Sequence, residues 1–122
     1  MQNRLHQKFI FLFYVVLVIL VSLMPSSVIK IGNLWKYDKF IHFFEYLILG
    51  FLFLNCFSPS EYLLKLLCLV IIVVIIFSGI DEFIVQKFFT STRIPDLYDW
   101  IMDVFGATIG VFARYFIGFK IR

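Results

Sequence analysis

The sequence predicts an all-α integral membrane protein, a four-helix transmembrane bundle that forms a single domain over residues 1–122. Hydrophobic residues make up 62% of the chain, including 17 phenylalanines, whereas a typical soluble domain is about 45–50% apolar. The mean hydropathy is +0.99. The apolar residues also gather in four segments, each close to the roughly 20 residues that a helix needs to cross the hydrocarbon core.

The four predicted spans follow one another with short connections. They are residues 9–24, 40–57, 62–80 and 100–119. Pro25 stops the first span because proline cannot continue a helix, and the turn sequence SPS stops the second. The third contains the β-branched run 70–76, which would suit a buried strand in a soluble protein. A lone strand in lipid would leave its backbone groups unpaired, so a helix is predicted.

The first span could also be a cleaved signal peptide. Arg4 and Lys8 precede an apolar run, as they would in a signal sequence. The run is long for that purpose, and the sequence SLMPSS lacks a convincing A-x-A cleavage site. We therefore expect the first span to be retained as a membrane helix.

The basic residues indicate membrane orientation. The formal net charge is +3, but the lysines and arginines are spread over ends and loops and form no basic stripe, so no nucleic-acid partner is expected. The lipid bilayer is the expected partner, with these side chains near its headgroups. Four spans place both termini on one side, and the positive-inside rule narrowly favours the cytoplasmic side.

The polar residues of the spans gather at one membrane interface. The second span begins there, the third ends there and the fourth begins there. Six of the eight acidic residues lie at those ends. The predicted polar pocket consists of Asp38, His42, Tyr46, Asp81, Glu82, Gln86, Arg93, Asp99 and Asp103.

Helical spacing brings these side chains onto shared faces. Asp38, His42 and Tyr46 follow at intervals of four residues, and Asp99 and Asp103 are also four apart, so each set forms a stripe along one helix. An ionisable side chain that faces hydrocarbon costs roughly 2.5–3.5 kcal/mol. Both stripes are therefore expected to face the bundle interior.

Some of these charges have simpler explanations. Asp38 and Asp99 stand near the starts of apolar helices, where a carboxylate can cap the N-terminus. Lys39 suits an ordinary interface charge. Arg93 keeps its proton and offers five donors in a fixed fork, so we expect it to bridge at least two of the carboxylates.

Glycine and aromatic residues in the fourth span suggest packing and anchoring. Gly106 and Gly110 form a G-x-x-x-G pattern that lets two helices approach closely. The approach can occur within the bundle or between two copies, so the sequence does not fix the oligomeric state. Trp100 suits the belt of aromatic residues found at membrane interfaces.

These residues form two blocks in which the chain resembles the VanZ-like family. The first block, D-K-x-x-H-F-x-x-Y, is here Asp38, Lys39, His42, Phe43 and Tyr46. The second block is here Asp81, Glu82, Gln86, Arg93, Asp99, Asp103, Gly106 and Gly110. The likeness covers about residues 37–114 and keeps both order and spacing. One departure is Asp103, where members of the family often carry Asn.

The resemblance implies a small multi-pass protein of the bacterial cell envelope, embedded in the cytoplasmic membrane. Some relatives are linked to resistance to glycopeptide antibiotics, teicoplanin in particular, and many members are expected to have unrelated housekeeping roles. A family name does not by itself fix an activity, because function depends on the chemistry of the site.

Three functions remain open from the sequence. In the first, the protein is not an enzyme, and the pocket binds a lipid headgroup or a lipid-linked cell-wall precursor. It can alternatively belong to an intramembrane enzyme, because an acid–histidine–acid set can supply a general base, and paired carboxylates can share a proton or hold a divalent cation. An ion pathway is disfavoured, since only Asn55, Lys65 and Arg114 are polar in the other half of the bundle. No cofactor is evident from the sequence, although the carboxylates have the chemistry to hold a divalent cation.

Overall fold

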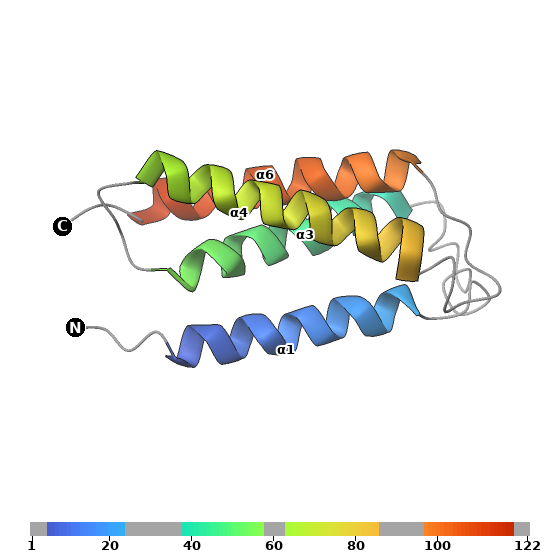
Figure 1. Cartoon of the computed structure of the whole chain (residues 1–122), viewed down its shortest axis with the longest axis horizontal. Helices are drawn as coiled ribbons and strands as arrows, with labels where there is room; N and C mark the ends of the chain where they lie inside the picture. Colours follow the sequence, from blue (N-terminus) through green and yellow to red (C-terminus); the bar gives the residue numbers. More distant parts are fainter. Residues whose placement is uncertain (1–4, 24–37, 58–62, 86–96, 119–122) are drawn as a thin grey trace.

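The fold is a bundle of four long helices (Figure 1). The computed structural model describes residues 5–23, 38–57, 63–85 and 97–118. The long helices are α1 (Leu5–Ser22), α3 (Asp38–Asn55), α4 (Leu63–Ile80) and α6 (Leu97–Gly118). The described residues contain no strand, which confirms the all-α prediction.

The helices alternate in direction along the bundle. In Figure 1, α1 and α4 run one way and α3 and α6 run the other, so α3 and α6 are parallel. The start of α1 and the end of α6 lie at the same end of the bundle. The ends that carry the predicted polar residues, namely the starts of α3 and α6 and the end of α4, all lie at the opposite end.

The end of α4 departs from the predicted third span. The chain does not leave the helix at Ile80 but continues as a π-helical turn, η2 (Asp81–Val85). This turn places two adjacent acids in the interior: Asp81 is 2% exposed and Glu82 is 0% exposed. Short π-helical turns occur frequently at functional sites.

Three of the helical segments are long and apolar enough to cross a membrane. They are Leu5–Ser22, Leu64–Val85 and Leu97–Ile117. The segment α3 is not among them, since Asp38, Lys39 and Glu45 interrupt its apolar sequence. That α3 forms a fourth span stays a prediction, which its position alongside α6 in the bundle supports.

The outer faces of the helices are apolar, as lipid contact requires. Phe13, Leu64 and Phe116 are each more than two-thirds exposed. Smaller apolar clusters fill the interior, one around Tyr46, Leu49 and Val74, the other around Leu54, Val70 and Val111. An exterior this hydrophobic is stable only where hydrocarbon covers it.

Helices α3 and α6 pack backbone against backbone. A Cβ atom built on Gly106 would overlap the carbonyl oxygen of Phe43, and one built on Gly50 would overlap that of Ala107. Gly110 makes the same kind of approach one turn further along. Glycine is the residue that permits this distance, and the close contact fixes the register in which side chains of α3 and α6 face one another.

Candidate functional site

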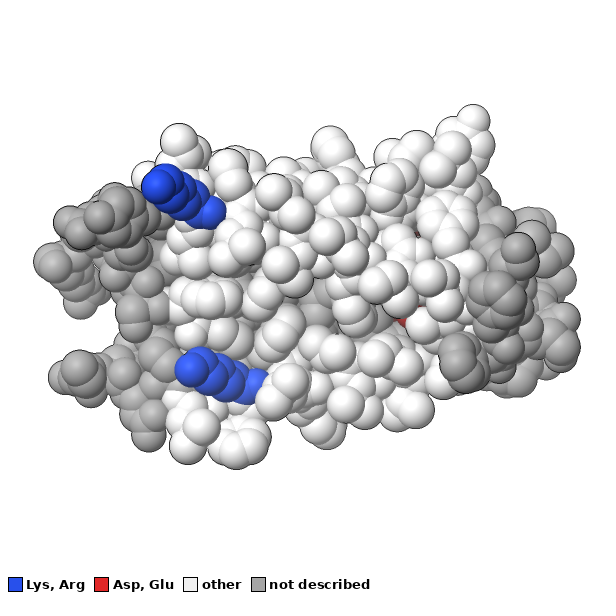
Figure 2. Space-filling model, in the orientation of Figure 1, with Lys and Arg blue, Asp and Glu red and all other residues white. Residues whose placement is uncertain are grey.

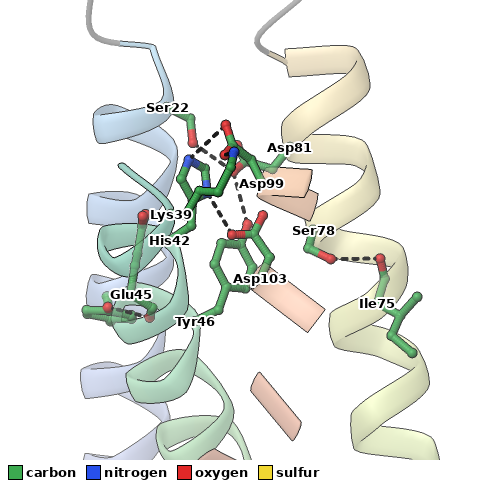
Figure 3. A network of polar contacts seen from close by, with 11 residues as sticks. Ser22, Lys39, His42, Glu45, Tyr46, Ile75, Ser78, Asp81, Asp99 and Asp103 are labelled. Atoms are coloured by element: carbon green, nitrogen blue, oxygen red, sulfur yellow. Dashed lines mark hydrogen bonds and ion pairs between the residues drawn. The ribbon is translucent and has the colours of Figure 1, made fainter. Parts of the chain in front are cut away.

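A cluster of buried polar side chains lies at the end of the bundle where α3 and α6 begin (Figure 3). Three of the long helices, α1, α3 and α6, contribute to it together with η2. We call it the polar cluster, and its members are Ser22, Lys39, His42, Tyr46, Asp81, Glu82, Asp99 and Asp103. Apart from Lys39, every member is at most 6% exposed.

The centre of the polar cluster is a histidine–carboxylate pair. His42 Nδ1 lies 2.7 Å from Asp103 Oδ1, and His42 Nε2 lies 3.7 Å from Asp99 Oδ2. The parallel register of α3 and α6 accounts for this arrangement, because it sets one polar stripe directly against the other. The imidazole therefore stands between two carboxylates in a place that water scarcely reaches.

A lysine pairs with one carboxylate of the polar cluster near the end of the bundle where α3 and α6 begin. Lys39 Nζ donates to Asp99 Oδ1 at 3.0 Å, and the lysine side chain is 48% exposed whereas that of Asp99 is 9% exposed. The sequence suggested Lys39 as an ordinary interface charge, but it pairs with a site carboxylate. Asp99 lies in the first turn of α6, which begins at Leu97, where a negative charge also complements the helix dipole.

Asp81 joins three elements of the bundle. Its Oδ2 accepts hydrogen bonds from Ser22 Oγ at 2.7 Å and from Tyr46 Oη at 3.0 Å. The bond from Ser22 attaches α1 to η2, and the bond from Tyr46 attaches α3 to η2. Sequence reasoning missed Ser22, because a single hydroxyl at the end of an apolar helix carries little signal before its partner is known.

Glu82 lies close to the histidine–carboxylate pair. One nitrogen of His42 and one carboxylate oxygen each of Glu82 and Asp103 lie within 4.8 Å of one another. Asp81 and Glu82 are consecutive residues of the helical turn η2, so their side chains point in different directions. Asp81 accordingly meets α1 and α3, while Glu82 meets His42 and Asp103.

Several predicted site residues are placed only in part or not at all. Asp38 is the first residue of α3, and its side chain lies outside the described residues. Gln86 and Arg93 also lie outside them, so the expected bridging by Arg93 stays a prediction. Trp100, expected in an aromatic belt, directs its Nε1 toward the carbonyl oxygen of Ile75 at 3.4 Å and so joins α6 to α4.

An apolar groove lies next to the polar cluster, between α1, α3 and α4. Its volume is about 240 Å³, and its lining residues are all apolar: Phe11, Leu12, Val15, Leu49, Phe53, Val73, Val74 and Phe77. Leu12 and Val73 are 56% and 40% exposed, so the groove opens at the bundle surface. The ring of Phe77 lies 6.3 Å from that of Tyr46, which places one end of the groove against the polar cluster.

The polar cluster supplies groups for several kinds of chemistry. A buried imidazole paired with a carboxylate can move a proton. Carboxylates gathered around an imidazole can hold a cation. A hydroxyl such as that of Tyr46 can donate to a bound anion or water. None of these groups lies on the outer face of the helices, so a ligand must enter the bundle or approach from its end.

Comparison with known proteins identifies one family. The sequence model of the VanZ/LLP1 family matches residues 4–118. The matched range contains all four long helices and every member of the polar cluster. No curated protein and no solved structure matches the chain.

Proposed function

The chain belongs to the VanZ/LLP1 family, and from this premise we propose that it is a lipid-binding protein of the bacterial cytoplasmic membrane. The polar cluster receives the headgroup of a membrane lipid or of a lipid-linked cell-wall precursor, and the neighbouring groove receives an acyl or prenyl chain. The observation that carries the proposal is the direct contact between a buried polar cluster and an open apolar groove.

Energetics favours a function for the polar cluster over a purely structural role. Buried ionic groups usually contribute less to stability than apolar residues of the same volume. A bundle selected only for packing would therefore replace His42, Glu82 and Asp103 with apolar side chains. Ionisable groups inside a membrane bundle are functional candidates by default.

The groove supports a lipid as the ligand class. It is wholly apolar, opens toward the bilayer and ends against Tyr46. A lipid has this same division into a polar head and an apolar chain. A soluble ligand would gain nothing from the groove, whereas a bilayer lipid reaches it without leaving the hydrocarbon.

The charge distribution supports an orientation with both termini in the cytoplasm. Among the described residues, Lys8, Lys65 and Arg114 lie toward the end where α1 begins, and only Lys39 lies at the end with the polar cluster. Figure 2 shows blue side chains toward one end of the bundle and almost no red surface, because the carboxylates are inside. Over the full sequence the bias is narrow, because Lys30, Lys36, Lys87 and Arg93 belong to the connections at the polar-cluster end. The proposed orientation, with the polar cluster at the outer interface, is the one that the positive-inside rule narrowly favours.

A second function is an intramembrane enzyme acting on the bound lipid, and the His42–Asp103 pair favours it. At 2.7 Å the carboxylate fixes the orientation of the imidazole, which is how a general base is held ready. Binding and catalysis would use the same groups. The two functions are therefore distinguished by how strongly a conservative substitution reduces each of them. Catalysis is expected to be abolished by Asp103→Asn, whereas binding should weaken only gradually.

Lipid analysis tests the proposal. We would purify the full chain in detergent, extract the retained lipid and identify it by mass spectrometry, for the parent, Val73→Trp and Ile72→Trp. Val73 lines the groove, while Ile72 is its neighbour on the exposed face and is 53% exposed. We expect Val73→Trp to lose the retained lipid and Ile72→Trp to keep it. Equal retention by both variants, or no lipid in the parent, would contradict the proposal.

The link to glycopeptide resistance is a separate part of the proposal. Expression of the chain in a susceptible Gram-positive host should lower susceptibility to teicoplanin if the lipid is a cell-wall precursor. Val73→Trp should remove the effect and Ile72→Trp should keep it. Unchanged susceptibility with the parent chain would restrict the ligand to lipids outside cell-wall synthesis.

A further inference from the structure

The polar cluster contains more acid than its described neighbours can neutralise. Asp81, Glu82, Asp99 and Asp103 are all at most 6% exposed. Among the described residues, Lys39 and His42 are the only cationic side chains that contact them. Buried charges in proteins are paired or coordinate metal ions, so a cation is a chemically suitable ligand for this cluster.

One oxygen of the Asp103 carboxylate marks a position for such a cation. Asp103 is 0% exposed, and its Oδ1 lies 2.7 Å from His42 Nδ1. Its other oxygen, Oδ2, is buried and has no hydrogen-bond partner among the described residues. A buried carboxylate oxygen without a partner carries its full desolvation penalty, which makes this atom a strong candidate for a ligand contact.

Three candidate ligand atoms, one of them from Asp103, lie close together in the polar cluster. A nitrogen of His42 and carboxylate oxygens of Glu82 and Asp103 lie within 4.8 Å of one another. Ligands at about 2.0–2.2 Å from a metal ion stand at most about 4.2 Å apart. Tetrahedral ligands stand about 3.4 Å apart, so rotamer changes that bring ligand atoms closer by up to about 1.4 Å would place all three on one ion.

From this geometry we propose that His42, Glu82 and Asp103 bind a divalent transition-metal ion. The donor set decides the class of metal. Magnesium and calcium take oxygen ligands almost alone, whereas an imidazole with two carboxylates suits zinc, manganese or iron. Three protein ligands leave a coordination position open, as in metal sites that bind a substrate or activate water.

The three ligands come from three different helical elements. His42 comes from α3, Glu82 from η2 and Asp103 from α6, and the glycine contact between α3 and α6 fixes two of the three. Lys39 holds Asp99, whose Oδ2 lies 3.7 Å from His42 Nε2. Partners of this kind orient a metal-binding imidazole, and their removal typically weakens metal binding about 10–100-fold.

The metal site stands without the lipid proposal, but the two can be joined. If the proposed function holds, the open position of the ion would face a phosphate oxygen of the lipid headgroup. That oxygen is anionic, whereas the polar cluster alone is acidic and would repel it. The experiment below uses metal ions without lipid, so its failure and the failure of lipid binding are distinguishable.

Metal loading of the purified full chain tests the proposal. After treatment with a chelator, the chain would be dialysed against zinc, manganese or magnesium chloride, and the bound metal would be measured by mass spectrometry. We expect a single zinc or manganese ion per chain and weak retention of magnesium. Glu82→Gln and Asp103→Asn should each raise the Kd for zinc at least about tenfold. Glu45→Gln, an acid on α3 outside the ligand set, should leave the Kd unchanged.

A cysteine variant provides a second, spectroscopic test in case a ligand variant folds poorly. Asp103→Cys supplies a thiolate at the ligand position, and cobalt bound to it would show a thiolate-to-cobalt charge-transfer band. The control Glu45→Cys should show no band. The proposal is overturned if the parent retains no zinc or manganese, if the ligand variants bind as tightly as the parent, or if both cysteine variants give the same spectrum.

Discussion

Gly110 of α6 lies so close to Leu47 of α3 that a Cβ atom at Gly110 would overlap the Leu47 carbonyl oxygen. The contact belongs to a continuous backbone approach that runs from the polar cluster toward the middle of the bundle. Side chains cannot relieve an overlap with a backbone carbonyl, so the two helices would have to separate to admit even a methyl group.

Substitution of this glycine is therefore expected to destabilise the bundle. Gly110→Ala should lower the free energy of unfolding in detergent by about 1–3 kcal/mol. Gly79→Ala is the matched control, because a Cβ there would meet only the Trp100 ring at 3.4 Å, and alanine is favoured over glycine in helices by about 1 kcal/mol. Thermal or denaturant unfolding measures both variants. Equal losses would mean that the α3–α6 contact is looser than the structure shows.

The His42–Asp103 pair should be strongly coupled. Removal of one partner of a buried ion pair typically costs about 3–5 kcal/mol, because the other charge is left buried. We expect Asp103→Ala or His42→Ala to cost close to this amount, and the double variant to cost much less than the sum. A double-mutant cycle on chelator-treated protein measures the coupling. Additive losses would show that the pair does not interact.

Ser22 should hold α1 onto the rest of the bundle. Its hydroxyl donates to Asp81 across two elements, and a hydrogen bond to a charged group contributes about 1.5–3 kcal/mol. Ser22→Ala is expected to speed hydrogen exchange of the α1 amides near that end. Ser78→Ala is the control, since that hydroxyl donates only to Ile75 of its own helix at 2.9 Å. Unchanged exchange in Ser22→Ala would remove Ser22 from the contacts that hold α1.

The orientation can be tested by labelling from outside intact cells. Cys56 and Cys68 would first be replaced by serine, and single cysteines placed at Ser60 and Ser91. With both termini in the cytoplasm, Ser91→Cys should react with an impermeant maleimide and Ser60→Cys should not. The opposite pattern would place the polar cluster at the cytoplasmic face.

Much of the fold follows from the sequence because the apolar segments are long and well separated. The predicted spans 9–24 and 100–119 differ from α1 and α6 by only a few residues at either end. The third span was predicted to end at Ile80, but a π-helical turn follows it. Hydropathy misses such a turn, since the acids that follow Ile80 suggest a loop when their buried partners are unknown.

The candidate site could be predicted only where it follows a helical stripe. Spacing alone indicates that His42 and Tyr46 share a face, and that Asp99 and Asp103 share another. It does not reveal that Lys39 pairs with Asp99, or that Ser22 reaches Asp81. Those contacts depend on how the helices are rotated about their axes, which helical spacing does not give. The glycine approach sets this rotation only between α3 and α6.

The charges of α3 bear on how the chain enters the membrane during synthesis. Asp38, Lys39 and Glu45 keep α3 from qualifying as a span by its own composition. Of these, Glu45 lies nearest the middle of α3, where a charge opposes insertion by roughly 2.5–3.5 kcal/mol. The carboxylates that satisfy Lys39 and His42 belong to α6, which is translated last. The second helix therefore depends on the fourth for stable residence in the bilayer. A nascent chain halted before α6 should leave α3 at the membrane surface, where a quality-control protease can reach it.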